Sequence, residues 1–477
     1  MQMGAPWTVV WNDPQKVPYA YQGNQWVGYD NPLSVALKVN YAKEKRLGGV
    51  MIWSVETDDF RGICGARYPI LATINANLQT LVDNQKLILS LMKMWHQLTA
   101  LVLLTILAFA SSATDKVVCY YGSWAAYRPG NGRFEVEDID PTLCTHLIYA
   151  FVGLNPNGSI RIIDPNLDIN KGGFKRFNAL KSRNPKVKTL ISIGGWNEKS
   201  EVFAEVASTS HLRTAFVNNA LNFVKTHGFD GFDLDWEYPG ERGGSSCDWS
   251  NFSLLVKEFK QVFKQHGLLI TAAVGATASL IRSSYEVPIL SANLDFINVM
   301  TYDLHGEWEK VTGHHSPLHA APHETTPSQL ELNIEACIDA WIKNGAAPEK
   351  LFLGVASFGH SFTLDNAANN RLGAPASQPG LPGPYTKQAG TLGYNEVCEM
   401  QMHEPWNVTW FDPQRVPYAY RANQWVGYDT KISIALKVYH AQSLRLGGMM
   451  VWSIDTDDFR GICGPKYPLI TAINENL

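Results

Sequence analysis

Residues Phe229–Gly240 read FDGFDLDWEYPG, and this alternation predicts a β-strand with two unlike faces. In an extended strand, successive side chains point to opposite faces. Three acidic residues therefore share one face: Asp233, Asp235 and Glu237. The apolar residues that alternate with them share the other: Phe232, Leu234 and Trp236. Such a strand needs helices to cover its apolar face and an enclosed polar interior for the acidic one.

The sequence on both sides of this strand repeats a strand-then-helix pattern. The apolar stretches expected to be strands are Val117–Tyr121, Leu147–Phe151, Val187–Ile193, Phe229–Trp236, Leu268–Val274, Phe296–Tyr302, Leu351–Phe358 and Gly448–Ile454. Amphipathic stretches such as HLRTAFVNNALNFVKTHG lie between several of them. Eight strands alternating with helices predict an α/β fold, the (β/α)8 TIM barrel. A long Gly- and Pro-rich stretch, about 362–431, predicts a small α+β insertion between strand 7 and helix 7.

In a barrel the acidic face of Phe229–Gly240 points to the interior. Like charges at close range raise a carboxyl pKa, so Asp233 and Asp235 are expected to hold a proton between them. Glu237 comes last, nearest the C-terminal face where barrel enzymes place their catalytic groups. A carboxyl kept protonated there suits a general acid. The alternative is a structural acidic cluster or a cation site, which is more often built from loop oxygens.

Composition excludes several classes of function. The 477 residues carry a formal net charge of −4 and no polybasic run, so nucleic acid is not an expected partner. No phosphate-binding loop, HExxH helix or paired CxxC pattern occurs in the sequence. The 15 Trp, 19 Tyr and 20 Phe residues supply faces for flat, weakly charged ligands, with core filling as the alternative use.

A segment beginning at Met92, MKMWHQLTALVLLTILAFASSATDK, resembles a secretory signal peptide. A short basic start at Lys93 precedes the uncharged apolar run Leu98–Ala110, which ends in small residues suited to cleavage. That run is too short for a bilayer core that needs roughly 20 residues, so no stable membrane span is expected. A buried core helix is the alternative. The mature protein is expected to be extracellular.

A repeat explains why this segment lies inside the chain. Pro6–Leu78 aligns without a gap with Pro405–Leu477, sharing stretches such as NQWVGYD and DDFRGICG. Two distant copies do not make a solenoid, which needs several short units. We therefore expect 1–78 to be an orphan partial repeat, 79–114 a junction with the signal-like segment, and 115–477 the working barrel. A genuine two-part protein is the alternative.

The working unit, Asp115–Leu477, resembles glycoside hydrolase family 18, the chitinases and chitinase-like lectins, over essentially its whole length. DGFDLDWE matches the family signature DxxDxDxE. SIGGW (192–196), MTYD (300–303) and MVWSIDTDDFRG (450–461) match the third-, sixth- and eighth-strand motifs, and CYYGSWAAYRPG resembles the first-strand segment. The resemblance implies a secreted enzyme that hydrolyses β-1,4 bonds between the N-acetylglucosamine units of chitin.

The resemblance also implies a role for each matching residue. Glu237 would protonate the glycosidic oxygen, Asp235 would orient the 2-acetamido group, and Asp233 would share a proton with Asp235. Tyr302 would hydrogen-bond the same acetamido group, and Trp452 would form the floor of the sugar pocket. The acetamido oxygen is then the nucleophile, a substrate-assisted retaining mechanism. Other residues match positions that stack on sugars or line the pocket: Trp124, Trp196, Trp308, Tyr120, Phe151, Met300 and Asp303.

Two features bear on activity. Non-catalytic members of the family typically replace the fourth-strand acid, so the presence of Glu237 favours an enzyme, of expected endo action, over a lectin or growth factor. An endoglycosidase acting on N-glycans is a third possibility, which the Trp-rich motifs disfavour. The seventh strand usually ends in Tyr-Gly-Arg, and this chain has Phe358-Gly359-His360. That departure leaves rate, pH optimum and chain-length preference open.

Cysteines and histidines complete the sequence-based expectations. Six cysteines of the working unit allow 15 pairings, and the resemblance alone pairs Cys119 with Cys144 and Cys398 with Cys463. No partner is predicted for Cys247 or Cys337. Sequons occur at Asn157, Asn251 and Asn407. Five histidines cluster in the sequence: His305, His314, His315, His319 and His323. Their spacing fits no closed zinc pattern, so neither a metal nor a cofactor is expected. A monomer that binds chitin and chitooligosaccharides is the expected form.

Overall fold

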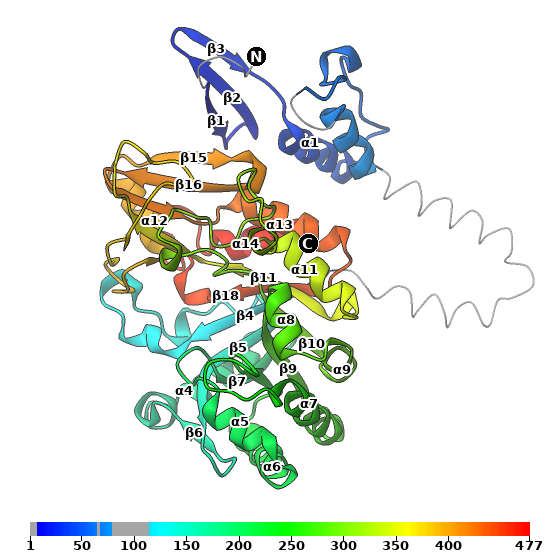
Figure 1. Ribbon diagram of the computed structural model, residues 1–477, viewed down its shortest axis with the longest axis vertical. Helices are drawn as coiled ribbons and strands as arrows, with labels where there is room; N and C mark the ends of the chain where they lie inside the picture. Colours follow the sequence, from blue (N-terminus) through cyan, green and yellow to red (C-terminus); the bar gives the residue numbers. More distant parts are fainter. Residues whose placement is uncertain (1–6, 64–66, 79–113) are drawn as a thin grey trace, which may run out of the picture. The chain divides into compact units, whose positions relative to one another are not determined.

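The computed structural model describes residues 7–63, 67–78 and 114–477 (Figure 1). The contacts within the chain divide it into two compact units, Met1–Ser111 and Ser112–Leu477. The signal-like segment expected within 79–114 lies outside the described residues except for its last position. Each unit is described by itself.

The second unit is a closed barrel of eight parallel strands. Going round the barrel, these are β4 (Lys116–Gly122), β5 (His146–Leu154), β7 (Lys188–Gly194), β8 (Gly231–Asp235), β9 (Leu269–Gly275), β10 (Phe296–Met300), β11 (Leu351–Ala356) and β18 (Gly448–Trp452). The ring closes because β18 pairs in parallel with β4 and β4 with β5. A short strand, β6 (Ile160–Ile162), adds antiparallel to β5. The predicted (β/α)8 fold is confirmed.

Helices follow the strands in sequence and cover their outer faces. They are α4 (Gly173–Ala179), α5 (Glu201–Ser208), α6 (Ser210–His227), α7 (Asp248–Lys264), α8 (Ala278–Ser284), α9 (Val287–Asn293), α10 (Pro327–Leu330), α11 (Ile334–Lys343), α13 (Lys431–Ser443) and α14 (Pro468–Asn476). The sequence marks both ends of α6. Its N-cap Thr209 accepts a hydrogen bond from the Leu212 amide, and Gly228 ends it in the left-handed conformation, where a side chain would be strained.

The two faces of β8 pack as the alternation predicts. Phe232 lies against Phe216 of α6 and Phe259 of α7, with ring centroids 6.1 and 5.6 Å apart. Trp236 stacks on Phe203 of α5 at 5.3 Å. These aromatic rings belong to the large apolar core between barrel and helices. Burying them there turns the carboxylates of the same strand into the barrel.

The end of β7 lies so close to β8 that only glycine fits. A Cβ at Gly194 would lie 2.1 Å from the Asp235 carbonyl oxygen, and the residue has a φ of 114°. The next amide, that of Gly195, donates to the same carbonyl at 2.9 Å. The SIGGW motif therefore fixes the backbone of Asp235 directly, which positions its side chain.

An α+β insertion separates β11 from α13. It contains a six-stranded sheet of β12 (Phe358–Thr363), β13 (Gln378–Pro379), β14 (Thr391–Gly393), β15 (Asn407–Phe411), β16 (Val416–Arg421) and β17 (Gln424–Gly427), together with α12 (Tyr394–His403). Its sheet begins at Phe358, earlier than the expected 362, because β11 ends at Ala356. Phe358 and His360 therefore belong to the insertion rather than to a barrel strand.

Both cysteine pairs implied by the resemblance are disulfide-bonded, Cys119 with Cys144 and Cys398 with Cys463. Cys247 is a free, exposed thiol and Cys337 a free, buried one. Within the described ranges, no helix combines the length and apolar character needed to cross a bilayer.

The first unit is small. It has an antiparallel sheet of β1 (Thr8–Asn12), β2 (Val17–Gln22) and β3 (Gln25–Gly28), followed by α1 (Pro32–Glu44) and a helix over 69–78. Its buried apolar cluster contains only Val35, Val39 and Ile74, with a few partly buried neighbours. This cluster is far smaller than the core of the barrel.

The aligned residues of the two copies differ sharply in burial. Trp26 is 66% exposed, whereas its counterpart Trp425 is completely buried. Met51 is 80% exposed, whereas its counterpart Met450 is completely buried. Residues 49–53 form no strand, although the same stretch in the second unit is β18. Similar sequences behave differently because the first unit has none of the other barrel strands to pair with and pack against.

Candidate active site

A cavity of about 690 Å³ opens at the carboxyl ends of the barrel strands. Its lining includes residues from the ends of six different strands: Trp124, Phe151, Trp196, Asp235, Glu237, Met300, Tyr302, Asp303 and Trp452. All nine were expected at the site from the sequence. Three other expected residues lie outside this lining: Asp233, Tyr120 and Trp308.

Asp233 lies at the bottom of the site and is fully buried. Its carboxylate accepts hydrogen bonds from Tyr120 Oη at 2.9 Å, Ser192 Oγ at 2.7 Å and Thr271 Oγ1 at 2.5 Å. Burial raises the pKa of Asp233, and the three hydroxyl donors offset only part of that rise. Tyr120 thus lies beneath the cavity, where it also accepts a hydrogen bond from Asn298 Nδ2.

Asp235 follows Asp233 by two residues on the same face of β8, nearer the carboxyl end of the strand, and lines the cavity. Its Oδ1 atom is buried and has no hydrogen-bond partner among the described residues. Burial and the neighbouring charges of Glu237 and Asp233 raise the pKa of Asp235 well above its ordinary value. A buried carboxyl oxygen without a partner is costly, so this atom is positioned to pair with a ligand. The shared proton of Asp233 and Asp235 stays a prediction.

Glu237 follows β8 and is the outermost of the three acids. Burial raises its pKa to about 7, with a further rise from Asp303 and an opposing effect of Tyr238 and Arg242. Near neutral pH a substantial share of this carboxyl therefore carries a proton, as a general acid requires.

Arg242 was not expected from the sequence, yet it connects two site residues. Its guanidinium lies 3.5 Å from the centre of the Trp196 ring, and its Nη1 donates to the Glu237 carbonyl at 3.1 Å. Trp196 is otherwise exposed. The Arg–Trp stack holds an aromatic face at the rim of the cavity and tethers it to the backbone of the acid. Its only sequence signal is a basic residue shortly after the DGFDLDWE motif.

Aromatic rings form the floor of the cavity. Trp452 and Phe151 stack with ring centroids 5.6 Å apart, and Phe151 stacks on Trp124 at 6.0 Å. Tyr302 is buried, and its hydroxyl lies 3.7 Å from Met450 Sδ. A stacked apolar floor beneath acidic groups suits a ring with one apolar face and polar edges, which is the character of a sugar.

Asp303, which lines the cavity, lies against a group of charged residues. Asp303, half exposed to the cavity, pairs with His360 Nε2 at 2.8 Å, and His315 Nδ1 lies 3.7 Å from the same carboxylate oxygen. Glu307 lies 3.4 Å from His360 Nδ1, and the exposed Trp308 packs edge-on against the His360 ring at 5.4 Å. The sequence marks His360 as a departure from the family pattern, but no sequence signal connects His315 or Glu307 with the site.

These charges shift one another's pKa values. Burial lowers the pKa of His360, but the pairs with Asp303 and Glu307 outweigh it and raise the pKa to about 9. The partial burial of the Asp303 carboxyl alone would raise its pKa, yet the nearby His315 and the hydrogen bond from His360 Nε2 hold the pKa well below its ordinary value. Asp303 is therefore a persistent negative charge on the cavity wall.

A barrel whose strand ends present a carboxyl with a pKa raised to about 7, an unpartnered carboxyl and an aromatic floor has the features of a glycoside hydrolase. The family model described as "Glycosyl hydrolases family 18" matches residues 4–58 and 116–457. The chain therefore belongs to glycoside hydrolase family 18.

Individual relatives agree with this assignment. Chitotriosidase-1 of Mus musculus is 40% identical over 384 residues, covering 78% of this chain and 80% of the mouse protein. The crystal structure of Ostrinia furnacalis Group IV chitinase matches at 42% identity with a TM-score of 0.75, covering 76% of this chain and 99% of that one. Human YKL-39, described as a pseudo-chitinase with retained chitooligosaccharide binding, matches at 40% identity and a TM-score of 0.71, covering 76% and 99%.

Proposed function

We propose that this protein is a chitinase that hydrolyses β-1,4 bonds between N-acetylglucosamine units by substrate-assisted catalysis. The observation that carries the proposal is Asp235 Oδ1, buried and unpartnered beside Glu237 and above an aromatic floor. An N–H donor from the ligand would satisfy this oxygen, and the 2-acetamido group of N-acetylglucosamine supplies one. Relatives named as chitinases support the choice of chitin.

Each acidic residue then has one task. With the sugar stacked on Trp452, Glu237 donates its proton to the glycosidic oxygen, and the bond to the leaving chain breaks. Asp235 accepts a hydrogen bond from the acetamido N–H and turns the acetamido oxygen toward the anomeric carbon, with Tyr302 as a second partner. The acetamido oxygen attacks the anomeric carbon and forms an oxazolinium ion. Asp233 and Asp235, which together hold one proton and one negative charge, help to stabilise the positive charge of this ion.

The second half of the reaction uses the same residues. Glu237, now deprotonated, takes a proton from a water molecule that attacks the anomeric carbon on the face just vacated. The oxazolinium ring opens, the acetamido group is restored, and the configuration at the anomeric carbon is retained. No enzyme nucleophile is needed, which distinguishes this scheme from the two-carboxylate mechanism.

A non-catalytic chitin-binding protein is the second candidate, favoured by one observation about relatives. A protein of 40% identity is described as a pseudo-chitinase that retains chitooligosaccharide binding. Binding alone would use the aromatic floor and the exposed Trp124, Trp196 and Trp308. It would not require Glu237 to be buried with a raised pKa, and this residue therefore favours the enzyme.

Hydrolysis of soluble chitin measured against pH tests the proposal. We expect release of N-acetylated oligosaccharides, with kcat/KM falling as the pH rises through about 7, because Glu237 loses its proton there. The pKa of Glu237, which sets this fall in kcat/KM, depends on the neighbouring groups Asp235, Tyr238, Arg242 and Asp303. The lengths of the products distinguish endo from exo action. Absence of any released oligosaccharide between pH 4 and 9 would contradict the proposal.

We further propose that Ser112–Leu477 performs catalysis without the first unit. All the site residues belong to this unit, and its barrel is closed without any strand from the first. The disulfides Cys119–Cys144 and Cys398–Cys463 support folding in an oxidising compartment and hence secretion.

Deleting residues 1–91 tests whether the second unit is catalytically active without the first. We expect the shortened chain to hydrolyse soluble chitin with kcat/KM within about twofold of the full chain, because no catalytic group is removed. Expression in secretory cells, followed by N-terminal sequencing of the secreted product, checks the expected start between about Ser111 and Asp115. Loss of activity on deletion, or secreted protein that retains 1–78, would overturn the proposal.

A further inference from the structure

Three atoms with the chemistry of metal ligands converge beside the cavity, where Asp303 forms part of its lining. They are Asp303 Oδ1, His315 Nδ1 and His360 Nε2, and all lie within 4.8 Å of one another. Asp303 Oδ1 is 2.8 Å from His360 Nε2 and 3.7 Å from His315 Nδ1. Ligand atoms about 2.0–2.2 Å from a tetrahedral ion lie roughly 3.3 Å apart, so small side-chain rotations are enough to admit one.

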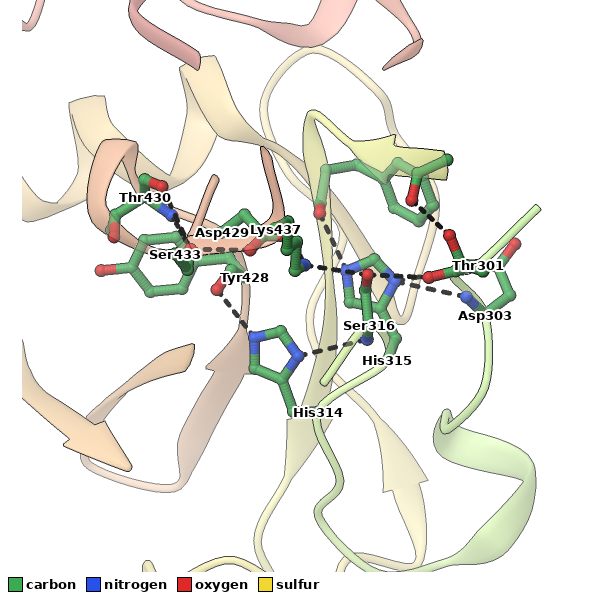
Figure 2. A network of polar contacts seen from close by, with 12 residues as sticks. Thr301, Asp303, His314, His315, Ser316, Tyr428, Asp429, Thr430, Ser433 and Lys437 are labelled. Carbon is green, nitrogen blue, oxygen red and sulfur yellow. Dashed lines mark hydrogen bonds and ion pairs between the residues drawn. The ribbon is translucent and has the colours of Figure 1, made fainter. Parts of the chain in front are cut away.

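The surrounding structure directs the lone pair of His315 toward Asp303. His315 Nε2 lies 3.1 Å from the Phe358 carbonyl oxygen, to which it donates its proton. Its Nδ1 is then an acceptor, whose one hydrogen-bond partner among the described residues is the Asp303 backbone amide, at a long 3.5 Å (Figure 2). Metal-binding histidines usually donate their other N–H to a carbonyl or carboxylate in this way. His315 is itself completely buried.

The segment that carries His315 is held rigidly. Ser316 Oγ donates to the Thr301 carbonyl at 2.8 Å and accepts from the buried Lys437 Nζ at 2.9 Å. His314 on the other side contacts the Tyr428 carbonyl at 2.8 Å. Figure 2 shows these bonds of Ser316, Lys437 and His314. Lys437 is neutralised by its own ion pair with Asp429, so its charge does not disfavour a cation nearby.

His360 has the same kind of support from the insertion. Its Nδ1 lies 3.1 Å from the Gly390 carbonyl oxygen and 3.4 Å from Glu307 Oε2, so this nitrogen is the donor and Nε2 faces Asp303. The order Glu307–His360–ligand atom is the carboxylate–histidine arrangement that orients metal ligands. Glu307 Oε2 is buried, and its one ionic partner among the described residues is His360, so its charge acts on that ring.

We propose that Asp303, His315 and His360 form a binding site for a divalent transition metal such as Zn²⁺. Two imidazole nitrogens and one carboxylate oxygen suit such ions, whereas Mg²⁺ and Ca²⁺ prefer oxygen ligands alone. The metal takes the place of the Nε2 proton of His360, which leaves to solvent. Asp303 is half exposed to the cavity, so the fourth position faces water or the bound sugar.

The site has a consequence for catalysis, which rests on the proposed function. Asp303 is one of the residues expected to contact the sugar chain, and a bound metal would engage its carboxylate. Zn²⁺ is therefore expected to raise KM for chitooligosaccharides and to slow hydrolysis, without occupying Asp235 or Glu237.

Calorimetric titration of the untagged full chain with Zn²⁺ tests the site without any enzyme assay. We expect one Zn²⁺ per chain, with affinity lowered at least about 10-fold in His315→Gln and in His360→Gln, since even outer-shell changes produce losses of that size. Mg²⁺ should not compete. His319→Gln and Cys247→Ser are matched controls, because His319 lies outside the cluster and Cys247 is a free exposed thiol. Both should bind Zn²⁺ as the unaltered protein does.

A spectroscopic measurement guards against misfolded variants. Cu²⁺ bound to the unaltered protein should show coupling to two imidazole nitrogens in its electron paramagnetic resonance spectrum. Absence of binding, unchanged affinity in both cluster variants, or equal loss in His319→Gln would overturn the proposal. Because binding is measured directly, a protein that binds Zn²⁺ but does not cleave chitin would refute only the proposed function, and the reverse result only the metal site.

Discussion

Replacing Glu237 with Gln is expected to lower the rate of chitooligosaccharide hydrolysis by at least about 10²–10⁴-fold, the usual contribution of a general acid. The amide keeps the size of the carboxyl but has no acidic proton for the glycosidic oxygen. It also cannot activate water in the second step. Burial keeps a substantial share of Glu237 protonated up to about pH 7, whereas the side-chain amide of Gln has no comparable acidic proton at any pH. The loss should therefore not be rescued at low pH.

Binding should survive this change, and a matched control is available. The aromatic floor of Trp452, Phe151 and Trp124 is untouched, so quenching of tryptophan fluorescence by a chitooligosaccharide should give a Kd within a few-fold of the original. Glu241→Gln alters an exposed carboxyl in the loop after the motif and should leave kcat unchanged. If Glu237→Gln hydrolysed chitooligosaccharides at a rate within a few-fold of the unaltered protein, Glu237 would not be the general acid.

The barrel and its acidic strand could be predicted because their signals are local. Phe232, Leu234 and Trp236 alternate with Asp233 and Asp235, and this period of two is enough to assign the two faces of a strand. All eight expected strands exist, with ends shifted by a few residues. The end of β11 moved because the chain at Ser357 leaves the barrel for the sheet of the insertion, and no change in polarity marks that point.

The cluster on the cavity wall could not be predicted from spacing. Asp303, His315 and His360 come from the end of β10, from a loop and from β12 of the insertion, and only the tertiary structure brings them together. Sequence rules for metal sites read ligands that lie close along the chain. Arg242 could not be predicted for a similar reason, since nothing in the neighbouring sequence indicates that its guanidinium stacks on Trp196.

Whether a given side chain is buried also depends on the elements that surround it, and not on the residue type alone. Tyr120 was expected to line the pocket, but its hydroxyl serves Asp233 from below, where Asn298 completes its hydrogen bonds. The contrast between Trp26 and Trp425 makes the same point. An identical residue in a matching stretch of sequence is exposed or buried according to whether the rest of a barrel surrounds it.

Fully deacetylated chitosan should be cleaved at least about 10²-fold more slowly than chitin oligosaccharides of equal length. Its glucosamine units lack the acetamido oxygen, and an oriented intramolecular nucleophile can be worth far more than this factor. Asp235 Oδ1 would also lose its expected partner, and the ammonium group of glucosamine would instead enter a site designed for a neutral amide. Reducing-end assays on matched pentamers would measure the ratio.

A partly acetylated chain makes the test independent of differences in binding. If the acetamido oxygen is the nucleophile, cleavage requires an acetylated unit on Trp452, at the position that becomes the new reducing end. Every new reducing end should then carry an acetyl group, whatever the overall degree of acetylation, and mass spectrometry of the products reads this directly. New ends bearing free amines in proportion to the substrate's composition would mean that a protein carboxylate, or water, attacks instead. Among the described acids that line the cavity, Asp235 lies beside Glu237, so such a result would make Asp235 the first candidate for a protein nucleophile.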